Sequence, residues 1–264
     1  MIESTSGKQI KNLMALINKS RARNEQGLFV AEGVRILSEA PADKIDKIYV
    51  SESFINGYNK EEYYERIKSI LDLKGYEVVA DKIFNQITDT KTPQGIMAVL
   101  KMPTYYMEKA MEETDNILFL DDIRDPGNLG TIIRTAEGAS FGLIVMSRGC
   151  VDIYNPKVVR ATMGAIYRLP FVYIEDMAYA IEKSKAKGYR VYAAHLEGKN
   201  YYDKINYSGK VGMIIGNEAN GISCLVKDSA TELIKIPMAG EVESLNAAIA
   251  AGILMYEVFR QKRL

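Results

Sequence analysis

The chain is poor in the residues that build disulfide scaffolds and metal sites. Its 264 residues include two cysteines, Cys150 and Cys224, a single histidine, His195, and no tryptophan. A disulfide framework needs several paired cysteines, and a zinc site needs three or four ligands at characteristic spacings. We therefore expect no disulfide framework and no metal, and we interpret the isolated His195 as structural rather than catalytic.

Charge of one sign and long hydrophobic runs are also missing. The 34 basic and 34 acidic residues cancel, so any binding of nucleic acid must come from a local patch. No run of about 20 apolar residues occurs, and no long apolar segment follows Met1, which argues against a membrane span and a signal peptide. With reduced thiols, a cytoplasmic location is the expectation.

The length suggests two domains, or one large one. In the first hundred residues, short strand and helix patterns alternate, and Ile10, Leu13, Leu16 and Ile17 follow helical spacing. Pro103 breaks this pattern, because proline neither continues a helix nor donates to a sheet ladder. We expect a small α/β domain over residues 1–102, a linker over 103–116 and a second domain over 117–264.

The second domain reads as a parallel sheet covered by helices. Six short runs are apolar on both faces, as buried parallel strands are. These runs are 117–120, 143–146, 171–174, 190–194, 213–215 and 233–236. Asn155 followed by Pro156 is a helix start signal, and the last helix is expected over 246–260.

Three polar, glycine-containing motifs stand at ends of these strands. They are Asn-Leu-Gly-Thr-Ile-Ile-Arg over 128–134, Ile-Ile-Gly-Asn-Glu-Ala-Asn-Gly over 214–221, and the stretch from Ile236 to Asn246. In open α/β sheets, ligands bind at the carboxyl ends of the strands. The motifs therefore predict one site assembled from segments that are far apart in the sequence.

Each motif also has a purely structural interpretation. Asn128 could cap a helix that starts at Leu129, and Ser244 could be an N-cap that places Asn246 in the first turn. Arg134 is either a solvated helical arginine or a clamp for a phosphate or carboxylate. The absence of G-x-G-x-x-G after a strand disfavours a nicotinamide or flavin enzyme, and the absence of G-x-S-x-G disfavours Ser244 as a nucleophile.

A basic segment near the N-terminus is the one candidate surface for nucleic acid. It contains no acidic residue from Lys8 through Asn24. Such a run is either a solvated face or a surface that follows phosphates. Its members are Lys8, Lys11, Lys19, Arg21 and Arg23.

Taken in order and spacing, the three motifs resemble those of the TrmH (SpoU) branch of the SPOUT RNA methyltransferases. The segment from Asn155 to Ala165 resembles the intermediate segment of that family. The N-terminal domain, with Phe-Val-Ala-Glu-Gly over 29–33 and Thr-Pro-Gln-Gly over 92–95, resembles the substrate-binding module of ribosomal-RNA members, which itself resembles an RNA-binding ribosomal protein.

The resemblance implies a trefoil knot in the C-terminal domain, a homodimer, S-adenosyl-L-methionine as methyl donor, and a ribose 2′-hydroxyl of RNA as acceptor. It implies large-subunit (23S) ribosomal RNA as substrate and includes enzymes that methylate ribosomal drug sites. A transfer-RNA ribose methyltransferase and a non-catalytic RNA-binding or ribosome-assembly protein are the alternatives.

The resemblance also implies roles for individual residues. Those expected to hold the cofactor are Gly216, Asn217, Ile236, Met238 and Leu245. Those expected to form the catalytic constellation are Asn128, Arg134, Glu218, Ser244 and Asn246.

Overall fold

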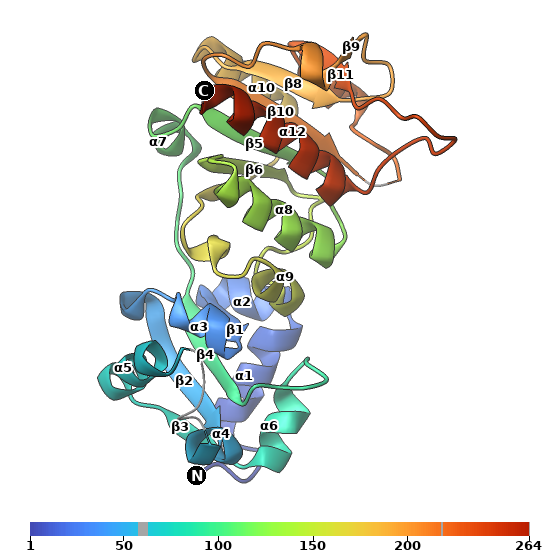
Figure 1. Ribbon diagram of the computed structural model, residues 1–264. Coiled ribbons are helices and arrows are strands. Elements are labelled where there is room, and N and C mark those ends of the chain that lie inside the picture. The colour runs from blue at the N-terminus through green and yellow to red at the C-terminus, as the bar shows by residue number, and fades with distance from the viewer. Residues whose placement is uncertain (58–62, 218, 264) are drawn as a thin grey trace. The chain divides into compact units, whose positions relative to one another are not determined.

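The computed structural model describes residues 1–57, 63–217 and 219–263, which form two compact units (Figure 1). Unit 1 comprises Met1–Thr104 and Asp152–Tyr167, and unit 2 comprises Tyr105–Val151 and Arg168–Leu264. The segment Asp152–Tyr167 falls within the sequence range expected for the second domain, yet it packs with unit 1. Its helix α9 (Pro156–Ala161) begins at the predicted cap Asn155, whose side chain accepts a hydrogen bond from the Lys157 amide.

Unit 1 contains a four-stranded sheet in the order β1-β4-β2-β3. Strand β4 is antiparallel to both β1 and β2, whereas β3 is parallel to β2. The strands are β1 (Leu28–Glu32), β2 (Ile45–Ser51), β3 (Glu77–Val79) and β4 (Ile96–Lys101). The helices are α1 (Lys8–Asn18), α2 (Ser20–Gln26), α3 (Val34–Ser38), α4 (Glu52–Gly57), α5 (Tyr64–Lys74) and α6 (Asp81–Ile87), besides α9.

The core of unit 1 follows the predicted apolar stripe of α1. Ile10, Leu13, Leu16 and Ile17 are all buried, and they share one cluster with Phe84 and its neighbours on α6. Helix α1 therefore lies beside α6. The short helices α2, α4 and α6 were not predicted, because six or seven residues make too little of a 3.6-residue period to be recognised.

Unit 2 is built on a seven-stranded sheet in the order β7-β6-β5-β10-β8-β11-β9, in which every neighbouring pair is parallel. All six predicted strands are present, and the short β9 is additional. The strands are β5 (Asn116–Asp121), β6 (Leu143–Ser147), β7 (Phe171–Ile174), β8 (Arg190–Ala194), β9 (Asn200–Tyr201), β10 (Val211–Gly216) and β11 (Glu232–Lys235). This confirms the predicted α/β class with a parallel-sheet domain.

Helices cover both faces of this sheet, which explains why its strands are apolar on both sides. Helices α8 (Pro126–Gly138) and α12 (Ala247–Lys262) lie side by side over one face (Figure 1). Buried residues of α7 (Met107–Glu112), α10 (Met177–Ala186) and α11 (Cys224–Ser229) share a cluster with Phe119 and Val145 of the sheet. Helix α7 lies within the range expected for the linker, but its Met107 and Met111 are buried in this core.

Two helix caps differ from the sequence expectation. Helix α8 begins at Pro126 with Asp125 as its N-cap, and the Asn128 amide donates to Asp125 Oδ1 at 2.7 Å. Asn128 is thus inside the first turn rather than the cap. Asn246, not Ser244, caps α12, because its Oδ1 accepts hydrogen bonds from the amides of Ala248 and Ile249. None of the described helices is long and apolar enough to cross a membrane.

Candidate active site

The ends of four parallel strands converge at the carboxyl edge of the unit 2 sheet. The chain leaves β5 toward β6 and β7 on one side, while β10 is inserted between β5 and β8 on the other. Such a switch in strand order leaves a crevice at the carboxyl edge, where ligands bind in open α/β sheets. The three motifs of the sequence analysis follow β5, β10 and β11, so they meet at this edge.

A cavity of about 330 Å³ opens there, within the range of about 300–1,000 Å³ typical of small-molecule sites. Its walls come from the ends of β8, β10 and β11 and from the start of α12. All five residues expected to hold the cofactor line it, and so does Ser244. These residues are Gly216, Asn217, Ile236, Met238 and Leu245.

His195 also lines the cavity, although the sequence analysis interpreted it as structural rather than catalytic. Its Nδ1 accepts a hydrogen bond from the Glu197 amide at 3.1 Å, which leaves Nε2 as the other polar atom of the ring. Glu197 is held by Lys227 at 2.9 Å, and this hydrogen bond lowers the pKa of the Glu197 carboxyl. The signal for His195 was its position directly after β8, a strand whose carboxyl end lies at the same edge.

Gly216 is required by the loop that follows β10. A Cβ placed at Gly216 would lie 2.4 Å from the carbonyl carbon of Gly221 and 2.5 Å from the amide nitrogen of Ile222. Asn217 and Gly221 exchange backbone hydrogen bonds of 2.9 Å in both directions. The backbone of Gly221 and Ile222 therefore occupies the space next to Gly216 that a side chain would need.

The Asn217 side chain organises the same edge. Its Nδ2 donates to the Asp122 carbonyl at 2.8 Å, and its Oδ1 accepts from the amides of Ala219 and Asn220. Asp122 has a φ of 62°, a left-handed conformation that is uncommon outside glycine. The loops after β5 and β10 are thus tied together beside the cavity, with backbone strain stored at the junction.

The expected catalytic residues are brought together only in part. Asn246 Nδ2 donates to Asn128 Oδ1 at 2.9 Å, which joins the starts of α12 and α8 next to Ser244. Arg134 is exposed on α8 and does not line the cavity. Its guanidinium group makes no hydrogen bond or ion pair with the residues that the structure describes. Glu218 lies outside the described residues.

The basic residues of the N-terminal segment divide into two groups. Lys8, Lys11, Lys19 and Arg21 are exposed. Arg23 is only 4% exposed, and its NH2 group pairs with Asp152 Oδ2 at 2.6 Å. Its NH1 group donates to the carbonyls of Leu16 and Ile17. The structure therefore corrects the prediction for Arg23: its guanidinium is committed to holding Asp152 and the end of α1, and it is not available to RNA.

Comparison with known proteins finds two family profiles that match this chain. The profile of the SpoU rRNA Methylase family matches residues 115–256, and that of the MRM3-like substrate binding domain matches residues 7–98. The chain is 31% identical over 261 residues to the 23S rRNA (guanosine(2553)-2'-O)-methyltransferase RlmP of Bacillus subtilis (strain 168), a match that covers 97% of this chain and 98% of the relative. It is 29% identical over 316 residues to rRNA methyltransferase 3, mitochondrial, of Homo sapiens, covering 97% of this chain and 73% of the relative.

A solved structure gives the same result. The AdoMet-bound rRNA methyltransferase from Sinorhizobium meliloti superposes with a TM-score of 0.82 at 29% identity, over 98% of this chain and 97% of that chain. The resemblance inferred from the three motifs is thereby confirmed. One profile spans more than half of the chain, and the Bacillus relative is matched over nearly its whole length; the chain belongs to the SpoU rRNA methylase family.

Proposed function

We propose that this chain transfers a methyl group from S-adenosyl-L-methionine to a ribose 2′-hydroxyl of large-subunit (23S) ribosomal RNA. Family membership supports methyl transfer to RNA, and the name of the Bacillus relative supports the 2′-oxygen and the 23S substrate. The observation that carries the proposal is the single cavity at the carboxyl ends of β8, β10 and β11, because it gathers every described residue expected to hold the cofactor.

The residues around the cavity fit this cofactor. Ile236, Met238 and Leu245 offer apolar surface, whereas the strand ends offer backbone donors and acceptors. Walls that combine apolar side chains with polar groups suit a ligand that combines an aromatic base with a charged tail. When bound, the cofactor would supply an electrophilic methyl group on a sulfonium, which is already a good leaving group.

The chain's own residues must then align the acceptor and manage its proton. Alignment of a nucleophile in the attack geometry can contribute roughly 7–11 kcal/mol to lowering a barrier. We assign this positioning to Ser244 and to the Asn246–Asn128 pair, which is fixed by the 2.9 Å hydrogen bond and by the α12 cap. The proton of the 2′-hydroxyl would pass to water, while Ser244 and the Asn246–Asn128 pair would hold the ribose in place.

Arg134 is assigned to an RNA phosphate. Arginine stays protonated in proteins, with a pKa above about 12, so it is a poor proton acceptor. The planar guanidinium of Arg134 suits a phosphate next to the reacting ribose. There its positive charge would stabilise the 2′-oxygen as negative charge develops on it. Glu218 is proposed to orient this arginine.

We further propose that the chain works as a homodimer, with the C-terminal segment threaded as a trefoil knot, in the cytoplasm. Support for a dimer comes from the face next to the site, where Ile249 and Tyr256 of α12 are 56% and 50% exposed. The two residues are seven positions apart and so share one face of the helix, and grouped exposed apolar side chains mark interaction sites. A dimer could also place Arg134 of one subunit at the cavity of the other, since Arg134 does not line the cavity of its own chain. Light scattering in solution tests the oligomeric state.

The decisive experiment incubates the protein with labelled S-adenosyl-L-methionine and, in separate reactions, with 23S RNA and transfer RNA transcribed in vitro. Incorporation is expected with the wild type, and loss of incorporation with retained cofactor affinity is expected for Arg134→Ala. Arg148→Ala, at an exposed arginine paired with Glu175, is the matched control and should stay active. Label in transfer RNA alone would favour the transfer-RNA alternative, and background incorporation into all RNA would favour a non-catalytic assembly protein.

A further inference from the structure

His195 lines the cavity at the ends of β8, β10 and β11, called the cofactor cavity below, but it belongs to none of the three motifs. It is the only histidine of the chain, and it follows β8 directly. Its side chain is partly buried, at 24% exposed. An imidazole in the wall of a ligand site either holds the surrounding loop or binds the ligand, and the hydrogen bonds of its two nitrogens distinguish these roles.

The backbone around His195 is fixed by a tight turn. The His195 amide donates to the Ile234 carbonyl of β11 at 2.9 Å, and the His195 carbonyl accepts from the Gly198 amide at 3.0 Å. A Cβ at Gly198 would lie 2.6 Å from the carbonyl carbon of Ile234, so glycine lets the turn pack directly on β11. The backbone that carries the imidazole is therefore anchored by hydrogen bonds that do not involve the ring.

The hydrogen bond at Nδ1 determines where the ring carries its proton. Nδ1 accepts from the Glu197 amide at 3.1 Å. In a neutral imidazole one nitrogen accepts and the other donates, so the proton is on Nε2. The Glu197 carboxylate does not draw the proton to Nδ1, because Lys227 holds it at 2.9 Å and it stays 3.9 Å from that nitrogen. Nε2 is thus a hydrogen-bond donor.

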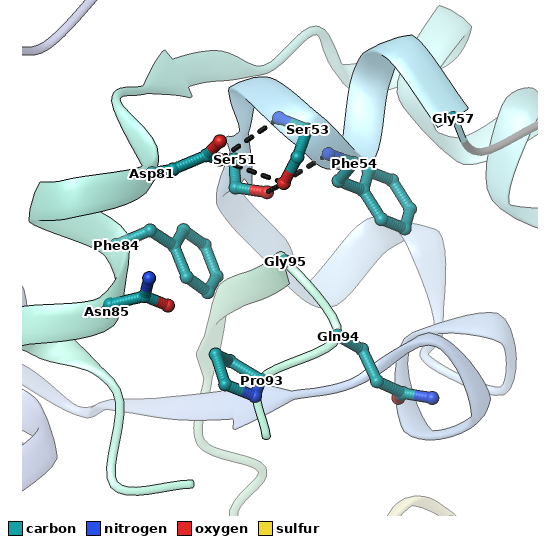
Figure 2. Close-up of a pocket in the computed structure, with 10 residues that line it drawn as sticks. All are labelled: Ser51, Ser53, Phe54, Gly57, Asp81, Phe84, Asn85, Pro93, Gln94 and Gly95. Carbon is teal, nitrogen blue, oxygen red and sulfur yellow. Dashed lines mark hydrogen bonds between the residues drawn. The ribbon is translucent and has the colours of Figure 1, made fainter. Parts of the chain in front are cut away.

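This donor is not used within the chain. Nε2 has no partner among the residues that the structure describes. Polar groups at cavity walls are usually engaged by the protein, as in a separate cavity of unit 1, where Asp81 Oδ1 accepts from both the amide and the hydroxyl of Ser53 (Figure 2). Since Nδ1 faces Glu197, which does not line the cofactor cavity, Nε2 is the polar atom that His195 presents to a ligand.

The order of the strands indicates which part of the cofactor meets this donor. Asn128, which accepts the hydrogen bond from Asn246 beside the expected acceptor site, follows β5 along the chain. Strand β10 separates β5 from β8. Because neighbouring strands lie about 4.8 Å apart, the end of β8 is roughly 10 Å from the end of β5. His195 is therefore remote from the place where the methyl group would react.

The apolar part of the lining is on the same side as His195. Ile236 and Met238 follow β11, which pairs directly with β8. Apolar side chains suit the flat face of adenine, and adenosine presents ring nitrogens and hydroxyl oxygens as acceptors. On this basis, and resting on the cofactor of the proposed function, we propose that His195 Nε2 donates a hydrogen bond to the adenosine part of S-adenosyl-L-methionine. His195 thus orients the cofactor from the end opposite its methyl group.

The single histidine makes this assignment testable by nitrogen NMR. Untagged protein labelled with ¹⁵N in its histidine ring reports only the two ring nitrogens of His195. We expect the Nε2–H tautomer in the free protein. Saturation with S-adenosyl-L-homocysteine, which contains the same adenosine, should shift the Nε2 resonance and slow exchange of its proton with water, while Nδ1 stays unprotonated. Unchanged ring resonances in the saturated protein, or a proton on Nδ1, would overturn the assignment.

Calorimetry identifies the part of the cofactor that His195 contacts. The two ligands are S-adenosyl-L-methionine and methylthioadenosine, which keeps the adenosine and lacks the amino acid tail. His195→Ala should weaken binding of both ligands about fivefold, as expected for one neutral hydrogen bond. His195→Gln retains an N–H donor at the end of its side chain and should regain part of this affinity. A loss confined to S-adenosyl-L-methionine would place the contact at the amino acid tail and contradict the assignment.

Two controls separate binding from structure. Lys199→Ala changes an exposed residue that follows the same turn and does not line the cofactor cavity, and it should bind both ligands as the wild type does. Chemical denaturation measures the stability of His195→Ala, and a lower free energy of unfolding with unchanged ligand affinity would make His195 purely structural. If the wild type bound neither ligand, the cofactor of the proposed function would fail too. Normal binding with unchanged ring resonances would reject the role of His195 alone.

Discussion

The side-chain amide of Asn246 donates a hydrogen bond to the side-chain oxygen of Asn128 at 2.9 Å, across 118 positions of the sequence. The same Asn246 caps α12 with its Oδ1, so one side chain both begins a helix and ties it to α8. Because the two functions use different atoms of the amide, they can be separated by substitution.

Asn246→Ala should lower the free energy of unfolding by about 1 kcal/mol through loss of the cap, and it should also lower methyl transfer. Asn246→Asp keeps an oxygen for the cap but loses the donor to Asn128. Its stability should therefore stay near that of the wild type while its activity falls as in the alanine variant. Chemical denaturation and the incorporation assay measure the two effects. Full methyl-transfer activity of Asn246→Asp would show that the hydrogen bond to Asn128 is not needed for the reaction.

Gly216→Ala should destabilise the loop after β10, because its Cβ would lie 2.4 Å from the backbone of Gly221. Forcing an extra methyl into a packed region typically costs about 1–3 kcal/mol. We expect a lower melting temperature together with weaker S-adenosyl-L-methionine binding by calorimetry. Gly240→Ala is the control, since a Cβ at Gly240 would meet no atom within 4 Å. If both glycine variants bound the cofactor normally, the loop would not be part of the cofactor site.

Arg23→Ala should destabilise unit 1 by about 3 kcal/mol, because it leaves the Asp152 carboxylate and two α1 carbonyls without their partner. Lys11→Ala, at an exposed residue of the same basic segment, should leave the free energy of unfolding unchanged and weaken RNA binding. Urea denaturation followed by circular dichroism and a filter-binding assay with 23S transcript distinguish the two roles. Normal stability of Arg23→Ala would contradict the structural assignment.

The two cysteines should differ in reactivity. Burial raises the pKa of the Cys150 thiol, which contacts the Leu120 carbonyl and the Ile123 amide, whereas Cys224 is exposed. Since the thiolate is the reactive form, a raised pKa leaves less of it near pH 8. A disulfide reagent should therefore titrate one thiol rapidly in the native protein and two after denaturation. Rapid reaction of a thiol in native Cys224→Ser would show that Cys150 is accessible.

The strands of unit 2 could be predicted because burial on both faces leaves continuous apolar runs such as 117–120 and 143–146. The meeting of Gly216 and Leu245 at one cavity could be predicted because both belong to motifs that follow such strands. Caps were harder, since Ser244 and Asn246 are both good N-cap residues and the contact with Asn128 selects between them.

Long-range partners account for the other differences. Arg23 looked like a member of a basic surface because its partner Asp152 lies 129 residues away in the sequence. The packing of Asp152–Tyr167 with unit 1 likewise could not be predicted, because no local sequence pattern indicates which hydrophobic core a segment packs into.

The central claim is that the cavity at the ends of β8, β10 and β11 serves methyl transfer to a ribose oxygen. The most direct measurement locates the label after reaction of 23S transcript with labelled S-adenosyl-L-methionine. A 2′-O-methyl group blocks alkaline cleavage of the next phosphodiester bond, so the account predicts label in an alkali-resistant dinucleotide. Label recovered only in base-methylated mononucleotides would contradict it.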